Sequence, residues 1–243
     1  MTTLFISDLH LDETRPDITR AFFEFLQNKA ANAESLYILG DFFEGWVGDD
    51  DSSPLIESIK SALKDLTQRG VSLYFMHGNR DFMLGDAFCA DVGGKLLADP
   101  TIISLAGEQT LLMHGDGLCT DDQEYMKFRS MIRSPAWQQA ALSKPLEERR
   151  AIAKQMRMAS NEANSNKAED IMDVNADAVI DALSRHRCKR LIHGHTHRPN
   201  RHTLVVNNET AERIVLGDWD SKIWYLTDEN NALTLRSSPF SDQ

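Results

Sequence analysis

Five short apolar runs, each followed by glycine or polar residues, constrain the fold of this chain more than any other feature. The runs cover residues 4–6, 36–39, 73–76, 111–113 and 191–192. Runs that are short, continuous and bounded by glycine indicate buried strands. Helical patterns lie between the early runs; residues 53–69 have capping residues and Pro54 at their start and Gly70 after their end. Strands that alternate with helices predict an α/β fold with parallel strand pairs.

The later part of the chain departs from this alternation in two places. Residues 212–219, 222–228 and 232–237 have strand patterns, which we interpret as a meander of hairpin strands. Residues 122–184 have almost no strand signal and are predicted to be helical. We interpret this region as an insertion, with a helical cap at about residues 122–170, inside a single domain that covers residues 1–243.

The charge of the chain limits its partners. The formal net charge is −11, with 26 Lys and Arg against 37 Asp and Glu, which argues against nucleic-acid binding over the whole surface. The insertion differs, because from residue 127 to 157 eight basic and two acidic residues give 8 − 2 = +6. This excess indicates a positive surface, or the solvated face of ordinary helices. The basic residues are Lys127, Arg129, Arg133, Lys144, Arg149, Arg150, Lys154 and Arg157.

Cysteine content and hydropathy predict the compartment. The three cysteines form an odd set without a C-x-x-C pair, which favours free thiols in a reducing compartment. The first ten residues lack a basic segment, and their apolar run is too short for a signal peptide. No stretch approaches the roughly 18 apolar residues of a membrane span. We therefore expect a soluble cytoplasmic protein.

Polar residues that follow the predicted strands form a metal-ligand pattern. Asp8 and His10 are two residues apart, as are His195 and His197, so on an extended strand end each pair points to one side. Strand ends at one edge of a sheet converge on one crevice. The ligand candidates are Asp8, His10, Asp41, Asn79, His114, His195 and His197.

The chemistry of this set predicts a dinuclear centre. Four imidazoles, two carboxylates and one amide oxygen are a mixed nitrogen and oxygen set without thiolate. Such a set suits Mn²⁺, Fe²⁺ or Zn²⁺ better than Ca²⁺ or copper(I). Seven ligands are too many for one ion with an open position, but they suit two ions that share a carboxylate.

The order of these motifs, D-x-H, GD, GN, a later H and GHTH, resembles the calcineurin-like metallophosphoesterases from Asp8 to His197. The resemblance implies a four-layer αββα sandwich, in which two mixed sheets pack face to face with helices outside. It also implies how the ligands are shared. Asp8, His10 and His197 would hold one ion, Asn79, His114 and His195 would hold the other, and Asp41 would bridge the two.

One residue departs from the family pattern. The third motif of the family usually reads G-N-H-[DE], whereas this chain has Arg80 in place of the histidine. Arginine has a pKa above about 12 and cannot protonate a leaving group near neutral pH. A phosphate monoester, with a second pKa of about 6, leaves without a proton, and a guanidinium can stabilise it. Asn79 and Arg80 are therefore the predicted catalytic residues for a pyrophosphate bond; the alternative is a surface arginine paired with Asp81.

Longer segments, among them LYILGDFFEGWVGDDD, SNEANSNKAEDIMDVN and LIHGHTHRP, resemble one branch of this family that acts in lipid A synthesis. The resemblance implies that two Mn²⁺ ions serve to hydrolyse UDP-2,3-diacylglucosamine to UMP and 2,3-diacylglucosamine 1-phosphate. It places the protein peripherally on the cytoplasmic face of the inner membrane. It implies phosphate contacts from Asn79 and Arg80, with His195 nearby. The sugar would be held by Asp122, Ser160, Asn164 and Lys167.

The insertion has apolar residues among its basic ones, a composition that suits a cap lying on anionic lipid. The same residues could instead pack the insertion onto the body. They are Trp137, Ala140, Ala141, Leu142, Leu146, Ile152 and Met156. Two other functions remain open at this point: a phosphohydrolase for a soluble nucleotide or a nucleic-acid diester, and a metal-free scaffold for protein binding. No nucleic-acid or protein partner is predicted.

Overall fold

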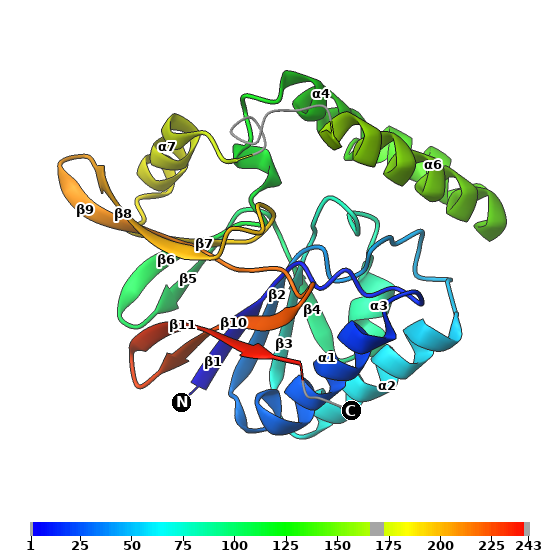
Figure 1. Ribbon diagram of the computed structural model, residues 1–243, viewed down its shortest axis with the longest axis horizontal. Coiled ribbons are helices and arrows are strands. Elements are labelled where there is room, and N and C mark those ends of the chain that lie inside the picture. Colours follow the sequence, from blue (N-terminus) through cyan, green and yellow to red (C-terminus); the bar gives the residue numbers. More distant parts are fainter. Residues whose placement is uncertain (1, 166–172, 241–243) are drawn as a thin grey trace.

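Two β-sheets form the centre of the computed structural model, which describes residues 2–165 and 173–240, without the side chains of 160–165 (Figure 1). The first sheet has the strand order β11-β10-β1-β2-β3-β4. Strands β1 to β4 run parallel, and β10 and β11 are added antiparallel at one side. The strands are β1 (Thr2–Ile6), β2 (Ser35–Leu39), β3 (Ser72–Met76), β4 (Gly94–Leu97), β10 (Lys222–Glu229) and β11 (Ala232–Pro239).

The second sheet has the order β5-β6-β7-β9-β8. Its inner pairs, β6 with β7 and β7 with β9, are parallel, and its outer pairs are antiparallel. Both sheets are therefore mixed. The strands are β5 (Thr101–Leu105), β6 (Glu108–Leu112), β7 (Arg190–His193), β8 (Asn200–Val206) and β9 (Glu209–Val215).

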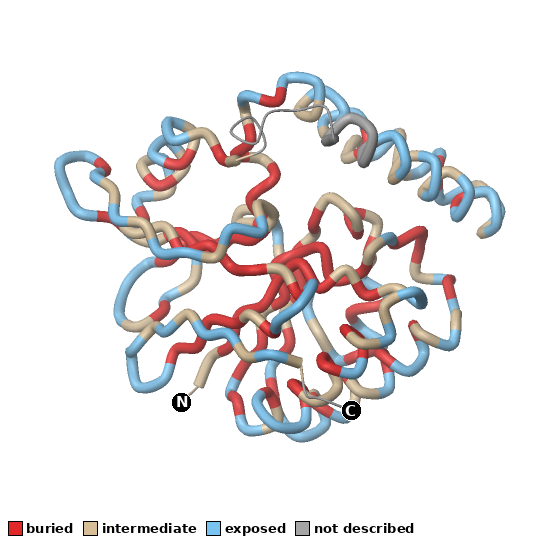
Figure 2. The backbone as a smooth tube through the Cα atoms, in the orientation of Figure 1, coloured by how far each residue is buried: buried red, intermediate tan, exposed pale blue. Residues whose placement is uncertain are grey.

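Side chains alternate along the strands between two apolar layers, one between the sheets and one under the helices. In β1, Phe5 belongs to the cluster between the two sheets, whereas Leu4 and Ile6 belong to the cluster under the helices. In β6, Leu112 joins the cluster between the sheets and Leu111 faces the outer side. Because neighbouring residues of a strand point to opposite faces, each sheet buries both of its faces. Figure 2 shows the buried backbone gathered in these central strands.

Helices cover the two outer faces and complete four layers. The first sheet packs against α1 (Pro16–Asn28), α2 (Pro54–Gln68) and α3 (Asp86–Asp91), and the second packs against α7 (Ala176–His186). The predicted helix at residues 53–69 is α2, with Ser53 as its N-cap. The αββα sandwich of two mixed sheets is therefore confirmed.

The predicted meander at the C-terminal end of the chain is wrong in one respect. Strands β10 and β11 form a hairpin in the first sheet, but β9 lies in the second sheet beside β7 and β8. Residues 216–221 cross from one sheet to the other, and Trp219 in this crossing is completely buried against Phe22 and Phe25. The local sequence pattern predicts the strands correctly. It does not show that the segment between β9 and β10 carries the chain from one sheet to the other.

Three helices of the insertion extend away from the sandwich. They are α4 (Gln123–Ile132), α5 (Pro135–Leu142) and α6 (Leu146–Ser165), and Figure 1 shows α4 and α6 beyond one edge of the sheets. We call them the cap helices. The expected boundary of the cap at residue 170 lies outside the described residues. None of the helices within the described ranges has the length and apolar character needed to span a membrane.

Candidate metal centre and adjoining pocket

The predicted ligands lie on the loops that follow five strands at one edge of the sandwich. Strands β1, β2 and β3 come from the first sheet, and β6 and β7 come from the second. Because the two sheets pack face to face, their loops meet there. The structure brings together Asp8, His10, Asp41, Asn79, His114, His195 and His197.

The ligand candidates form two groups, each spacious enough for one ion. In the first group, His10 Nε2 lies 3.3 Å from His197 Nε2, which lies 3.5 Å from Asp8 Oδ1. The ligand atoms of this group all lie within 4.8 Å of one another. Three nitrogen and oxygen donors around one point fit a divalent cation.

The second group contains the amide of Asn79. Its Oδ1 lies 3.0 Å from His114 Nε2 and 2.8 Å from His195 Nδ1. Asp41 completes this group and also reaches the first, because Oδ1 lies 3.8 Å from His114 Nε2 and Oδ2 lies 3.9 Å from His10 Nε2. This position between the groups is the one that a bridging carboxylate needs.

The backbone at the ligands is not extended, contrary to the expectation from the two-residue spacing. Five ligand candidates have φ between 48° and 68°, in the left-handed region, which costs of order 1–3 kcal/mol for each non-glycine residue. The loops leave the sheets in sharp turns, and these turns aim the side chains inward. Strained backbone of this kind persists where the surroundings impose it. The five residues are Asp8, His10, Asp41, His195 and His197.

Glycines stand before three ligand candidates because the loops approach one another too closely for a side chain. A Cβ on Gly78 would lie 2.1 Å from Asp41 Oδ1, and a Cβ on Gly194 would lie 2.2 Å from Asp8 Oδ2. Real Cβ contacts are never so short. The glycines of the GN and GH motifs therefore allow the two groups to pack against each other.

Asp81 holds the loop that carries Asn79 and Arg80. Its carboxylate is 1% exposed and accepts the backbone N–H groups of Gly78 at 2.7 Å, Phe42 at 2.8 Å and Asp41 at 3.3 Å. The alternative in which Arg80 merely pairs with Asp81 is thus wrong, because backbone donors occupy this carboxylate. Among the side chains that the structure describes, no carboxylate oxygen lies within 4.0 Å of the Arg80 guanidinium.

The electrostatics of the centre favour a cation. Burial by itself lowers the pKa of His114, but Asp41 and Asp8 outweigh it and raise the pKa to about 9. The pKa of His197 is raised to about 9 in the same way: burial lowers it, but the carboxylate of Asp8 outweighs this effect. Burial and the charge of His114 lower the pKa of His195 to about 3. Since carboxylates hold protons on nitrogens that would bind an ion, metal binding has to displace those protons.

Glu44 is a residue that the sequence pattern did not reveal. Its Oε2 lies 2.9 Å from His10 Nδ1, so the other ring nitrogen faces the first group. Its Oε1 lies 3.5 Å from Arg157 of α6. A carboxylate behind a ligating imidazole fixes the orientation and basicity of the ring. Glu44 is three residues after Asp41 in the same loop, and no periodicity distinguishes it from its neighbours.

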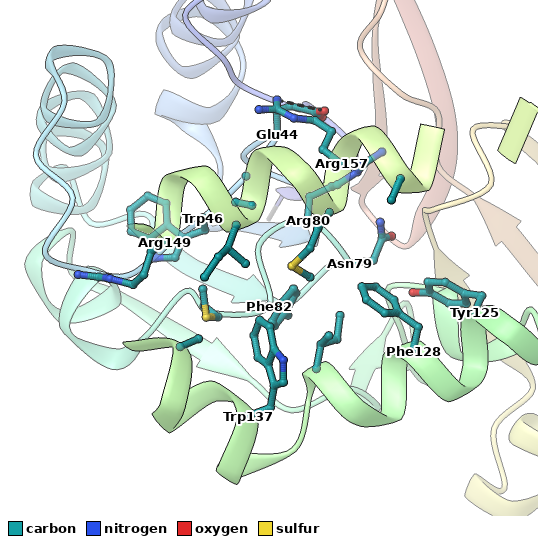
Figure 3. Close-up of a pocket in the computed structure, with 18 of the residues that line it drawn as sticks. Glu44, Trp46, Asn79, Arg80, Phe82, Tyr125, Phe128, Trp137, Arg149 and Arg157 are labelled. Carbon is teal, nitrogen blue, oxygen red and sulfur yellow. Dashed lines mark ion pairs between the residues drawn. The ribbon is translucent and has the colours of Figure 1, made fainter. Parts of the chain in front are cut away.

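An apolar pocket of about 320 Å³ opens beside the centre, between the body and the cap helices (Figure 3). Asn79 and Arg80 line it, together with Tyr125 of α4. The size lies in the range of small-molecule sites. Most of the remaining lining is apolar: Trp46, Phe82, Met83, Phe128, Ile132, Trp137, Ala141, Ile152, Ala153, Met156 and Ala159.

The basic residues of the insertion do not form a free positive surface. Arg149 is 5% exposed, pairs with Asp50 and donates to Val47 O at 2.5 Å. Arg150 pairs with Asp51. Six of the eight basic residues have an acidic partner: Arg129, Arg133, Lys144, Arg149, Arg150 and Arg157. The excess of +6 is thus largely compensated, mostly by acidic residues of the body.

Of the four predicted sugar-binding residues, Asp122 is the one whose side chain lies within the described part of the chain. Asp122 is 9% exposed, and its Oδ1 accepts the N–H of Tyr125 at 3.0 Å as the N-cap of α4. The side chains of Ser160 and Asn164, and all of Lys167, lie outside the described residues. Their contacts with substrate stay predictions.

The fold and the two-group centre define a class of protein. The profile of the family described as calcineurin-like phosphoesterase matches residues 1–199. This chain belongs to the calcineurin-like phosphoesterase family.

Several relatives share about half of their residues with this chain. The chain is 52% identical to the UDP-2,3-diacylglucosamine hydrolase of Marinobacter nauticus, with 100% of both chains covered. It is 54% identical to the UDP-2,3-diacylglucosamine hydrolase of Stutzerimonas stutzeri, over 93% of this chain and 95% of that protein. For the same hydrolase of Pseudomonas paraeruginosa the identity is 51%, with 99% of each chain covered.

Proposed function

We propose that this protein hydrolyses the pyrophosphate bond of UDP-2,3-diacylglucosamine to UMP and 2,3-diacylglucosamine 1-phosphate, a step of lipid A biosynthesis. Water adds to phosphorus and the phosphorus–oxygen bond of the anhydride breaks. The names of the full-length relatives support this substrate. The observation that carries the proposal is the position of Arg80 between the candidate metal centre and an apolar pocket, with no carboxylate partner among the described side chains.

Arg80 suits the departure of a phosphate. The leaving group is a phosphate monoester with a second pKa of about 6, so it leaves as an anion and needs no acid. A guanidinium can donate hydrogen bonds to two of its oxygens at once, because the fork of N–H groups matches phosphate geometry. Asn79, which directly precedes Arg80 in the chain, would both hold an ion and contact the phosphate.

Two Mn²⁺ ions per chain are the proposed cofactors, and the donor set described above fits them. Asp8, His10 and His197 would hold one ion, and Asn79, His114 and His195 the other, with Asp41 between them. When bound, the ions supply Lewis acidity at the scissile phosphorus. The chain's own contribution is to hold the seven ligands by strained loops and by the Asp81 and Glu44 contacts.

The apolar pocket is the proposed site for acyl chains of the substrate. Trp137 and Phe82 contact each other across it, with ring centroids 5.9 Å apart, so body and cap both contribute. A soluble nucleotide or a nucleic-acid diester would leave this apolar wall unused. The pocket thus favours the lipid substrate over the other phosphohydrolase reaction, and the metal-ligand set argues against a metal-free scaffold.

We also propose that the protein acts peripherally at the cytoplasmic face of the inner membrane, where its substrate resides. The support is apolar exposure on the cap helices rather than charge. Met131, Leu142 and Met158 are 51%, 46% and 63% exposed and do not line the pocket. Serine at all three positions should weaken sedimentation with phosphatidylglycerol vesicles, while turnover of detergent-dispersed substrate stays near that of wild type. Unchanged sedimentation would contradict the proposal.

The decisive experiment is incubation with UDP-2,3-diacylglucosamine and Mn²⁺, followed by identification of the products. We expect UMP and the 1-phosphate in equal amounts. Arg80→Ala should lower kcat by about 10²–10³, the usual loss for one preorganised charge donor. Arg80→Lys should restore part of it, because a point charge lacks the planar fork.

The comparison with an alkyl phosphodiester makes the test specific. Arg80→His supplies a possible acid, so it should help this ester, whose leaving group needs a proton, and do little for the pyrophosphate. Wild-type turnover of the pyrophosphate by Arg80→Ala would refute the role of Arg80. Equal turnover of acylated and non-acylated substrates would refute the lipid specificity.

A further inference from the structure

A buried carboxylate lies just behind the candidate metal centre and has no place in the function proposed above. Asp116 is 0% exposed and stands two residues after His114. Its Oδ2 accepts from the Tyr125 hydroxyl at 2.7 Å, from Arg129 Nε at 2.8 Å and from Arg133 Nη2 at 3.1 Å. A buried charge requires such compensation. The donors, however, all come from the cap.

The three donors form one stripe of a single helix. They are four residues apart along α4 and the residue that follows it, so they share a face. Two apolar residues of α4, Phe128 and Ile132, line the apolar pocket, as does Tyr125 itself. The helix that forms part of the pocket wall is therefore fixed to a carboxylate beside the metal centre.

This stripe also touches the second ligand group directly. Arg133 Nη2 donates to Gly78 O at 2.9 Å, immediately before Asn79. The Tyr125 ring stacks on the ring of His195, with centroids 6.2 Å apart and planes inclined by 25°. Through Arg133 and Tyr125, Asp116 is therefore connected to the loop that carries Asn79 and to His195, whose Nδ1 contacts Asn79 Oδ1.

The attachment of the cap through Arg149 and Arg150 lacks this connection. Arg149 and Arg150 of α6 pair with Asp50 and Asp51, and none of these four residues contacts a predicted ligand in the described structure. They hold the cap to the body without reaching the centre. Of these two attachments of the cap to the body, only the contact at Asp116 leads to the second ligand group. Variants at the two places can therefore distinguish positioning of the ligands from attachment of the cap.

We propose that Asp116 is a positioning residue: with Arg133 and Tyr125 it holds Asn79 and His195 in place for the ion of the second group. The inference rests on the proposed function only in taking these side chains as metal ligands. Asp116 itself is fully buried and belongs to neither ligand group. Residues behind metal ligands typically change metal affinity by about 10–100-fold when replaced.

The test is titration of the metal-free protein with Mn²⁺, followed by isothermal calorimetry and electron paramagnetic resonance without substrate. We expect Asp116→Asn to weaken one of two Mn²⁺ ions by about 10–100-fold and to leave the other within about twofold. At limiting Mn²⁺, the coupled two-ion signal should be lost and a single-ion signal retained. His114→Ala supplies the reference spectrum for an empty second site.

Two further variants keep the result decisive. Arg133→Met removes the contacts to Asp116 and Gly78 without burying a new charge, so it answers the question if Asp116→Asn does not fold. Asp50→Asn is the matched control, because it loosens the cap elsewhere and should leave both Mn²⁺ affinities unchanged. Wild-type binding of both ions by Arg133→Met and by any folded Asp116→Asn would overturn the inference. Equal weakening by Asp50→Asn would overturn it too, whereas an inactive wild type with these binding results would refute only the proposed substrate.

Discussion

Replacing Asp81 by alanine should destabilise the whole domain, because three backbone donors depend on this one carboxylate. Oδ1 accepts the N–H groups of Gly78 and Asp41, and Oδ2 accepts that of Phe42. Asp81 is 1% exposed, so water cannot readily replace the lost acceptor. Each buried donor left unsatisfied costs about 1–3 kcal/mol.

The lengths of the three hydrogen bonds to Asp81 allow the expected loss of stability to be estimated. The bonds from Gly78 and Phe42 are short, at 2.7 and 2.8 Å, whereas the bond from Asp41 is long, at 3.3 Å. Counting two full losses and one partial loss, we expect Asp81→Ala to lower the free energy of unfolding by about 3–6 kcal/mol. This is a large part of the roughly 5–15 kcal/mol by which domains are stable. Asp81→Asn can keep Oδ1 as an acceptor, so about 1–3 kcal/mol is expected.

The assay is urea denaturation of the metal-free protein, followed by far-ultraviolet circular dichroism. Asp65→Ala is the control, since Asp65 is exposed on α2 and should change stability by less than about 0.5 kcal/mol. If Asp81→Ala has a midpoint and slope like those of Asp65→Ala, the reasoning is refuted. In that case the three backbone bonds do not hold the loop of Asn79 and Arg80.

Three other predictions concern the centre and its pocket. Glu44→Gln should weaken Mn²⁺ binding about 10–100-fold by loosening His10, which calorimetry measures; an unchanged isotherm would exclude this role. Trp137→Ala should raise KM for the diacylated substrate roughly tenfold, from lost apolar burial, but not for a short-chain analogue; equal changes would argue against an acyl site. Because the pKa values of His114 and His197 are about 9 in the metal-free protein, both rings bind protons below that pH. Mn²⁺ affinity should therefore rise with pH up to about 9 and then level off; calorimetry at several pH values would contradict this if affinity stayed constant.

The local sequence determines the elements and the chemistry of the centre. Short apolar runs bounded by glycine predict the strands that carry the loops, and Ser53 with Pro54 marks the start of α2. The ligand types are also visible, because imidazoles, carboxylates and an amide follow successive strands. These features depend on the periodicity and chemistry of residues close together in the chain, which a sequence displays directly.

Only the tertiary structure decided which distant groups meet. The sequence predicts extended ligand pairs, but packing of two sheets turns the backbone at Asp8 and His10 left-handed. The basic insertion indicates a positive surface, but Arg149 reaches across to Asp50 of the body and is buried. Asp116 has no local signal at all, since its donors lie up to 17 residues away on a helix of the cap. Pairings of this kind depend on how the elements pack, and packing energy is absent from any local pattern.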